Sequence, residues 1–246
     1  MNRRWAWILV TALMAGCGDK DDQSKREKKR GSSSAPSGQA AAPGSSAEGP
    51  GEHSAAERKI LVKLARQTLT AVVNGEDIPK VDVGELPAKL KADKGCFVTL
   101  NKSGQLRGCI GYIFPRGPLY KAVMENARNA ALYDRRFPRV APAELRDIEI
   151  EISILTVPKP LAFTSLDDLL ARLRPNIDGV VFEAKSPQRT YGSVYLPQVW
   201  EKIPDRKEFM TQLSRKAGLS LPDWAWRPDR VKIQTYQAEV FHEWRR

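Results

Sequence analysis

The stretch Leu106-Arg107-Gly108-Cys109-Ile110-Gly111 places a thiol and a guanidinium in an apolar run that contains two glycines. In a β-strand, side chains alternate between the two faces, so this run predicts Arg107, Cys109 and Gly111 on one face. A glycine inside a strand usually marks a bulge, or the close approach of a ligand or of another backbone segment. Two interpretations therefore stay open: an open notch that presents a thiol, or a small buried cysteine with glycines that admit a neighbouring element.

This stretch forms the second half of a predicted β-hairpin. Residues 96–101 and 105–113 are rich in apolar and β-branched side chains, and Lys102-Ser103-Gly104 supplies a short turn that contains glycine. If Lys102 and Ser103 are the two turn residues, Cys96 lies opposite Cys109. The hairpin then allows a cross-strand disulfide, which a shift of one residue in the register removes.

The rest of the chain alternates helical and strand patterns. Ser54 and Glu57 form a capping box before an apolar helical pattern that Gly75 ends, and isoleucines alternate with polar residues over 148–154. Further helices are predicted from 118, over 165–173 and over 205–217, and further strands over 179–184, 190–196 and 231–241. These elements predict an α/β domain of the α+β type, in which helices flank a mixed, largely antiparallel sheet.

The N-terminal residues predict export and lipidation. Arg3 and Arg4 precede an apolar segment over 5–15 that is too short to span a bilayer, as in a signal peptide. Leu13-Met14-Ala15-Gly16-Cys17 resembles a bacterial lipobox, so we expect residues 1–16 to be removed and Cys17 to carry fatty acids such as palmitate. An ordinary secretory signal is the alternative. The predicted location is the bacterial cell envelope, on the periplasm-facing side of a membrane.

Residues 17–53 predict a disordered tether that joins this anchor to a domain over 54–246. The segment is made of Ser, Gly, Ala, Pro and charged residues, and it has no apolar periodicity with which to form a core.

Charge and motifs limit the possible functions. The chain has a formal net charge of +11, and Arg135, Arg136 and Arg139 form its densest basic cluster after residue 54, which indicates anionic partners. Because an exported protein rarely meets nucleic acid, we rank nucleic acid low among these partners.

The sequence has no Walker loop, dinucleotide fingerprint or zinc spacing, and we predict no metal and no cofactor. Its two histidines are His53 and His242, so a Cys–His dyad would need Cys109 and His242.

Several segments together resemble the AMMECR domain family, over the part of the chain that follows about residue 53. They are residues 106–111, Pro118-Leu119, Asp134-Arg135-Arg136-Phe137, Glu144-Leu145, residues 152–155, Gly179, Leu196-Pro197-Gln198-Val199 and Lys216-Ala217-Gly218-Leu219. The resemblance implies an α/β fold with two unequal subdomains around a cleft. It also implies that two family motifs form the functional site of this chain. The first is Arg107, Gly108, Cys109 and Gly111, and the second is Asp134, Arg136 and Phe137.

The family resemblance does not imply an established reaction. Many bacterial members are encoded beside a Memo-like protein and a radical S-adenosylmethionine enzyme, which suggests a shared pathway. This chain differs from the family in two ways: Ser214 lies near a position where members often have cysteine, and the chain carries an export signal.

Three functions follow from these residues. In the first, Arg107 and Arg136 bind a small anion, Asp134 orients them, and Gly108 and Gly111 complete the site. In the second, the domain is an enzyme that uses Cys109 as a nucleophile, in a modification pathway with Memo-like and radical S-adenosylmethionine proteins. In the third, the domain binds a protein partner. The sequence ranks binding above catalysis and leaves open whether the protein is an enzyme.

Overall fold

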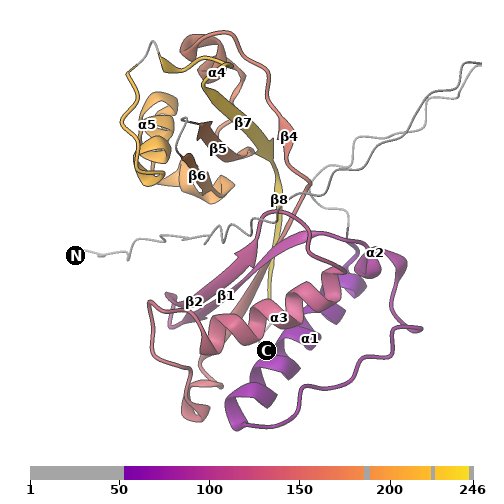
Figure 1. Ribbon diagram of the computed structural model, residues 1–246. Coiled ribbons are helices and arrows are strands. Elements are labelled where there is room, and N and C mark those ends of the chain that lie inside the picture. The colour runs from indigo at the N-terminus through magenta and orange to yellow at the C-terminus, as the bar shows by residue number, and fades with distance from the viewer. Residues whose placement is uncertain (1–52, 186–188, 223–224, 244–246) are drawn as a thin grey trace, which may run out of the picture. The chain divides into compact units, whose positions relative to one another are not determined.

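The computed structural model describes residues 53–185, 189–222 and 225–243, all of which belong to one compact unit (Figure 1). The predicted signal peptide, Cys17 and the tether up to residue 52 lie outside the described residues. No helix in the described part of the chain is both long enough and apolar enough to cross a membrane.

The first sheet has four antiparallel strands in the order β2-β1-β3-β8. The strands are β1 (Gly95–Lys102), β2 (Gln105–Tyr112), β3 (Ile148–Leu155) and β8 (Ala238–His242). Helices α1 (Ala55–Asn74) and α3 (Leu119–Leu132) cover one face, where the isoleucines of β3 meet the apolar sides of both helices (Figure 1). Two short helices, α2 (Ala88–Lys91) and η1 (Pro142–Glu144), lie in the connections.

The second sheet is also antiparallel and has the strand order β4-β7-β5-β6. Its strands are β4 (Lys159–Pro160), β5 (Gly179–Lys185), β6 (Thr190–Tyr195) and β7 (Val231–Tyr236), and α4 (Leu166–Arg172), η2 (Pro197–Glu201) and α5 (Arg206–Lys216) accompany it. Its core contains the rings of Trp200 and Phe209, which stack with their centroids 3.6 Å apart.

Two adjacent connections carry the chain from one sheet to the other. Thr156 follows β3 and Gln237 precedes β8, and the Thr156 N–H donates to the Gln237 carbonyl oxygen at 3.0 Å. The Gln237 N–H donates to the Thr156 hydroxyl at 2.8 Å. The predicted strand over 231–241 is therefore two strands, and the predicted single sheet is two sheets. The α+β class, the antiparallel pairing and the flanking helices are confirmed.

The helix ends follow the predicted local signals. Ser54 and Glu57 form the capping box of α1, and Gly75 ends that helix with a left-handed φ of 77°. Asp205 caps α5 through the Glu208 N–H. His53, which the sequence assigned to the tether, is buried, and its Nδ1 lies 2.7 Å from Glu239 on β8.

Candidate functional site

The hairpin turn and a bulge that follows it place Cys109 opposite Thr99 and not opposite Cys96. The two turn residues are Ser103 and Gly104, both with positive φ (52° and 72°), as a tight hairpin turn of this type requires. Cys96 then pairs with Tyr112, and both Cys96 and Cys109 are free thiols. The predicted register was wrong by three residues, two from the position of the turn and one from a bulge between the turn and Cys109, and the cross-strand disulfide that depended on it is excluded.

A bulge separates Arg107 from Cys109. The register shifts between Leu100, which pairs with Gly108, and Asn101, which pairs with Leu106, so Arg107 has no opposite residue on β1. Its side chain lies with Lys102 and Glu144, whereas Cys109 and Leu106 join the apolar cluster on the other face of the sheet. The prediction that Arg107 and Cys109 share a face was wrong, because one extra residue reverses the alternation.

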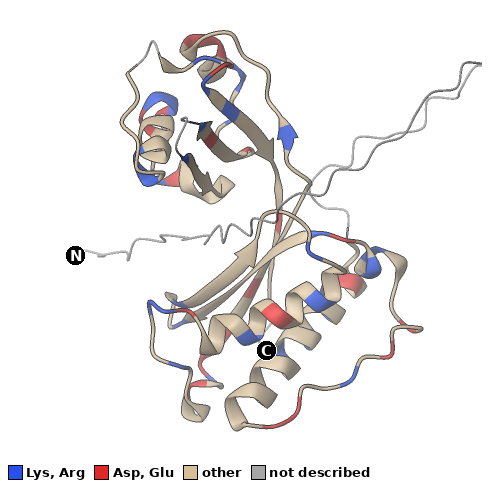
Figure 2. Cartoon of the chain, viewed as in Figure 1, with Lys and Arg blue, Asp and Glu red and all other residues tan. Residues whose placement is uncertain are grey.

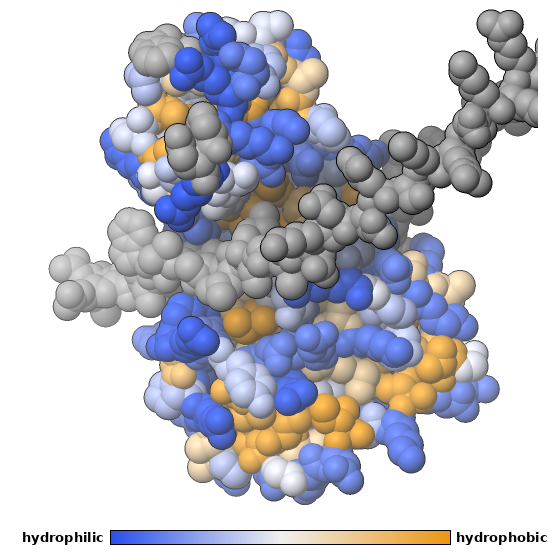
Figure 3. Space-filling view, in the orientation of Figure 1, coloured by the Kyte–Doolittle hydropathy of each residue, from blue (hydrophilic) through white to orange (hydrophobic). Residues whose placement is uncertain are grey.

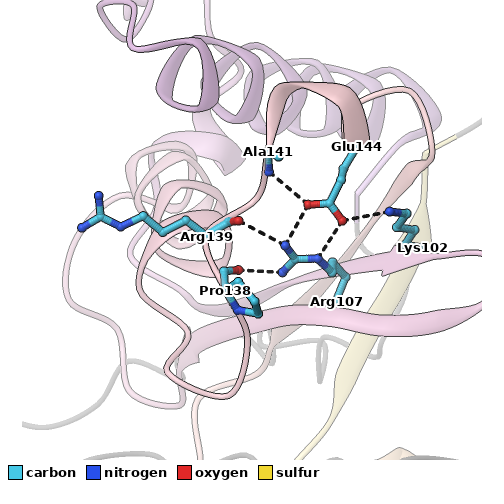
Figure 4. A network of polar contacts seen from close by, with 6 residues as sticks. All are labelled: Lys102, Arg107, Pro138, Arg139, Ala141 and Glu144. Atoms are coloured by element: carbon cyan, nitrogen blue, oxygen red, sulfur yellow. Dashed lines mark hydrogen bonds and ion pairs between the residues drawn. The ribbon is translucent and has the colours of Figure 1, made fainter.

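The Arg107 guanidinium is fully engaged with its own chain (Figure 4). It donates to both oxygens of Glu144 at 3.0 and 2.8 Å, and to the carbonyl oxygens of Pro138 and Arg139 at 2.9 and 3.2 Å. The Arg107 side chain is 13% exposed. The hydrogen bonds from Arg107, followed by one from the Ala141 N–H, lower the pKa of Glu144 to about 2. These contacts support a structural role in which Arg107 fastens residues 138–144 to β2, and its predicted role in anion binding stays a prediction.

Asp134 and Arg136 instead surround the backbone of Cys109. Asp134 accepts the Cys109 N–H at 2.9 Å and pairs with the Arg136 guanidinium through both of its oxygens, at 2.9 and 2.6 Å. Arg136 in turn donates to the Cys109 carbonyl oxygen at 3.1 Å. Burial alone would raise the pKa of Asp134, but the hydrogen bonds from Arg136 and Cys109 outweigh it and lower the pKa. The structure thus brings Cys109, Asp134 and Arg136 together, as the two motifs predicted.

The two motif glycines contact their own chain closely. A Cβ at Gly108 would lie 2.3 Å from the Ala130 carbonyl oxygen of α3, and one at Gly111 would lie 2.4 Å from the Phe97 ring. These contacts support the packing interpretation of the sequence, in which glycine lets another element approach. The ligand-binding role predicted for Gly108 and Gly111 stays a prediction.

The Cys109 thiol is buried and protonated at neutral pH. Burial raises its pKa to about 11, while the Thr99 hydroxyl, 3.3 Å from Sγ, and the charge of Arg136 lower it less strongly. A thiolate is the nucleophilic form, so this environment suits a binding or packing role better than nucleophilic attack.

Lys216 is a site residue that the sequence analysis did not single out. It lies at the end of α5, where its ammonium donates to the Val194 carbonyl oxygen at 2.9 Å and lies 5.0 Å from the centre of the Tyr195 ring. Burial, followed by the positive charge of Arg136, lowers the pKa of Lys216 to about 8. The signal that could have found it is Lys216-Ala217-Gly218-Leu219, one of the segments that carried the family resemblance.

Thr99, Glu151 and His242 continue the row of Cys109 across the first sheet. Thr99 is opposite both Cys109 and Glu151, and Glu151 is opposite His242. Two strands therefore separate His242 from Cys109, or about 14 Å at ordinary strand spacing. A direct Cys109–His242 dyad is excluded by this distance.

Elsewhere on the described surface, the charges, the apolar side chains and one hollow give less indication of a functional site. Basic and acidic residues are interspersed over the helices in the view of Figure 2, and apolar side chains gather over the α1–α3 layer in Figure 3. A hollow of about 310 Å³ lies between α4 and the start of α5, lined in part by Leu170 and Arg206. No group of three or more His, Cys, Asp or Glu residues within 53–185, 189–222 and 225–243 has the arrangement of a metal site.

The comparisons with known proteins agree with this geometry. The family model described as AMMECR1 matches residues 62–241, which include the hairpin, the Asp134–Arg136 loop and Lys216. The chain belongs to the AMMECR1 family. Similar AMMECR1 proteins come from archaea: one from Methanothermobacter thermautotrophicus is 39% identical over 77% of this chain and 96% of its own length. Another from Methanococcus aeolicus is 37% identical over 77% of this chain and 92% of its own length.

A solved structure supports the AMMECR1 fold as well. The crystal structure of an uncharacterised protein from Pyrococcus horikoshii is similar with a TM-score of 0.66 and 30% identity, and it covers 76% of this chain and 92% of that one. Ser214, where AMMECR1 relatives were expected to carry cysteine, is buried in α5 and donates to the Thr211 carbonyl oxygen at 2.8 Å.

Proposed function

We propose that this protein is a membrane-anchored lipoprotein whose AMMECR1 domain binds a small anion between Lys216 and Arg136, beside Cys109. The observation that carries the proposal is the position of the Lys216 ammonium, which donates to the Val194 carbonyl oxygen at 2.9 Å and whose pKa is lowered by burial and by the positive charge of Arg136, a residue from a different part of the chain. A bound phosphate or carboxylate would relieve that repulsion. The bound anion would therefore raise the pKa of Lys216 again.

The Lys216 ammonium has N–H donors left with which to bind such an anion. An ammonium carries three N–H donors, and the structure uses one of them on the Val194 carbonyl oxygen. No carboxylate pairs with Lys216 in the described part of the chain, whereas Arg107 has Glu144 and Arg174 has Asp178. Arg136 contributes positive charge while Asp134 holds it in place. Lys216 is therefore added to Arg136 in the proposed anion site, while the anion-binding role of Arg107 stays a prediction.

Titration calorimetry with inorganic phosphate tests the binding proposal. We expect Lys216→Met to weaken phosphate binding at least about tenfold, because a hydrogen bond from a charged donor is lost. Lys63→Met is the matched control, since Lys63 is exposed on α1, and it should bind phosphate as the unchanged protein does. Equal affinity in the two variants would remove Lys216 from the site.

The lipoprotein part of the proposal rests on the sequence of residues 1–17. Two or more acyl chains on Cys17 would hold the protein stably on a membrane without a spanning helix. In this arrangement the AMMECR1 domain faces the periplasm, and a protein partner at the same surface is the alternative occupant. Metabolic labelling with an alkyne-bearing fatty acid should mark the unchanged protein and not Cys17→Ala, and only the variant should leave the membrane fraction.

Catalysis by Cys109 is the second candidate from the sequence. Its motivation is the position of the thiol beside the proposed anion site, near Arg136. The raised pKa of the thiol favours the binding proposal. A nucleophilic step would first need a nearby base or a ligand that lowers this pKa.

A further inference from the structure

The outer strands of the two sheets, β2, β8, β4 and β6, differ in how their free edges are protected. On β2, the loop after α3 binds the N–H and the carbonyl oxygen of Cys109, at 2.9 and 3.1 Å. On β6, the Lys216 ammonium donates to the Val194 carbonyl oxygen at 2.9 Å, and β4 has only two residues, one of which is Pro160. Loops, lysines, prolines and short strands all discourage another strand from pairing with an edge. Within the described part of the chain, the five residues of β8 have none of these devices.

Alternate residues of β8 direct their backbone groups away from the sheet. The Glu243 N–H, just after the strand, donates to the Ile150 carbonyl oxygen of β3 at 2.8 Å. Hydrogen-bonded and non-hydrogen-bonded pairs alternate along an antiparallel ladder, so Ala238, Val240 and His242 point their N–H and C=O groups outward. None of the described residues donates to or accepts from these outward groups. The edge is therefore a row of backbone groups that can pair with another strand.

The side chains of β8 leave this edge accessible. Val240 is 37% exposed and the His242 side chain is 66% exposed, on the face of the sheet opposite α1 and α3. The one carboxylate of the strand, Glu239, projects to the other face, where it contacts Arg58 at 2.8 Å and His53 at 2.7 Å. Its negative charge is thus balanced within its own chain and does not repel an approaching strand.

We propose that β8 pairs with β8 of a second copy of this chain, antiparallel and about a two-fold axis beside Val240. In this register Val240 lies opposite Val240 of the second copy, Ala238 lies opposite His242, and each pair exchanges two backbone hydrogen bonds. On the other face Glu239 lies opposite Phe241, so no two like charges oppose one another. The first sheets of the two copies then form one continuous sheet.

A second copy fits this edge for two reasons. A two-fold axis makes every contact twice, and closed two-fold dimers are the commonest protein assemblies. In addition, the buried ring of His53 lies against Glu239, so the chain that leads to the proposed lipid anchor enters the domain at β8. Two anchored copies share one membrane surface, which raises the concentration of each edge near the other. This second reason, unlike the pairing itself, rests on the proposed function.

A cysteine at the two-fold axis tests the pairing in the full chain. Opposed residues of a hydrogen-bonded pair have Cα atoms about 5.5 Å apart, which suits a disulfide. We expect Val240→Cys, in a Cys17→Ala background, to form at least about tenfold more disulfide-linked dimer than Lys232→Cys when oxidised by air with copper phenanthroline, because paired copies hold the two thiols together. Lys232 is the matched control, since it is exposed on the inner strand β7. The remaining cysteines, Cys96 and Cys109, are buried, and electrophoresis without reductant measures the linked dimer.

Proline at position 242 separates edge pairing from any other contact between two copies. The His242 N–H points outward, so His242→Pro removes a donor of the proposed pairing and no hydrogen bond to β3. Added to Val240→Cys, His242→Pro should reduce the linked dimer to the level of Lys232→Cys. His242→Ala, which keeps the N–H, should leave the linked dimer of Val240→Cys unchanged. The melting temperatures of the proline and alanine variants should agree, since both lose the same side chain.

Two results would overturn the proposal. One is a linked dimer no more abundant in Val240→Cys than in Lys232→Cys, and the other is a linked dimer that persists in His242→Pro. The first comparison does not depend on the folding of the proline variant. Neither result bears on the proposed anion site or lipid anchor, because phosphate calorimetry and fatty-acid labelling test those separately.

Discussion

Asp134 holds the backbone of Cys109 from a position 25 residues later in the chain, by accepting its N–H at 2.9 Å. Arg136, paired with Asp134, donates to the carbonyl oxygen of the same cysteine at 3.1 Å. Since β2 is the outer strand of its sheet, these are backbone groups that a neighbouring strand would otherwise pair. The loop after α3 thus closes an exposed sheet edge, which is a common protection against edge-to-edge association.

Asp134→Asn should lower the free energy of unfolding by about 2–4 kcal/mol, because the half-buried Arg136 loses its countercharge. Urea denaturation at neutral pH measures the change. Asp168→Asn is the control, because the Asp168–Arg172 pair lies on the surface of α4 and should contribute much less to stability. Equal losses in the two variants would show that the loop does not depend on the Asp134 charge.

Native Cys109 should react slowly with iodoacetamide at pH 7 and faster as the pH approaches 11. Its thiolate fraction is small in this range because burial raises its pKa to about 11. Cys96, with a pKa of about 12 for the same reason, should react more slowly still. Peptide mass mapping measures each cysteine separately, and urea-unfolded protein gives the unprotected rate. Rapid native labelling of Cys109 at pH 7 would restore the nucleophile hypothesis.

Features set by neighbouring residues could be predicted from the sequence. The cap at Ser54, the stop at Gly75 and the alternating strand over 148–154 depend on contacts within a few positions, and the structure has all three. The motif residues Cys109, Asp134 and Arg136 also came together as expected.

Features that depend on a single extra residue or on distant contacts could not be predicted. The bulge at Arg107 has only an ambiguous local signal, because the following Gly108 can mark either a bulge or a close approach, yet the bulge reverses which face the Arg107 side chain occupies. Gln237 divides two strands with neither glycine nor proline beside it. Glu151 looks like any polar residue of an alternating strand, because nothing in the sequence shows that its face is partly covered. Lys216 and Arg136 are 80 positions apart, and only the fold brings them close.

Glu144→Gln should remove part of the acid sensitivity of the protein. The pKa of Glu144 is about 2 in the folded chain, through Arg107 and Ala141, against about 4.3 in an unfolded one. Because the folded value is the lower one, the carboxylate stabilises the fold above pH 5, and this contribution disappears as the pH falls to 2. Urea denaturation over pH 2–7 should show the unchanged protein more stable than the variant at neutral pH and the two converging in acid. A gap that stays constant across this range would contradict the assignment.

His53→Ala tests whether the ordered domain starts at the residue that the sequence assigned to the tether. His53 is 4% exposed, and its Nδ1 lies 2.7 Å from a Glu239 oxygen, while Arg58 binds the other oxygen at 2.8 Å. Removing the ring leaves a cavity and an unsatisfied carboxylate oxygen, so we expect a loss of about 1–3 kcal/mol in the free energy of unfolding. His242→Ala is the matched control, since that ring is 66% exposed and its loss should change stability by less than about 0.5 kcal/mol. Hydrogen exchange should also quicken at the first turn of α1 in His53→Ala only, because Glu239 then holds the start of this helix through Arg58 alone. If the two variants have equal stability and equal exchange at α1, the buried ring does not anchor the helix, and the tether extends through His53 as the sequence predicted.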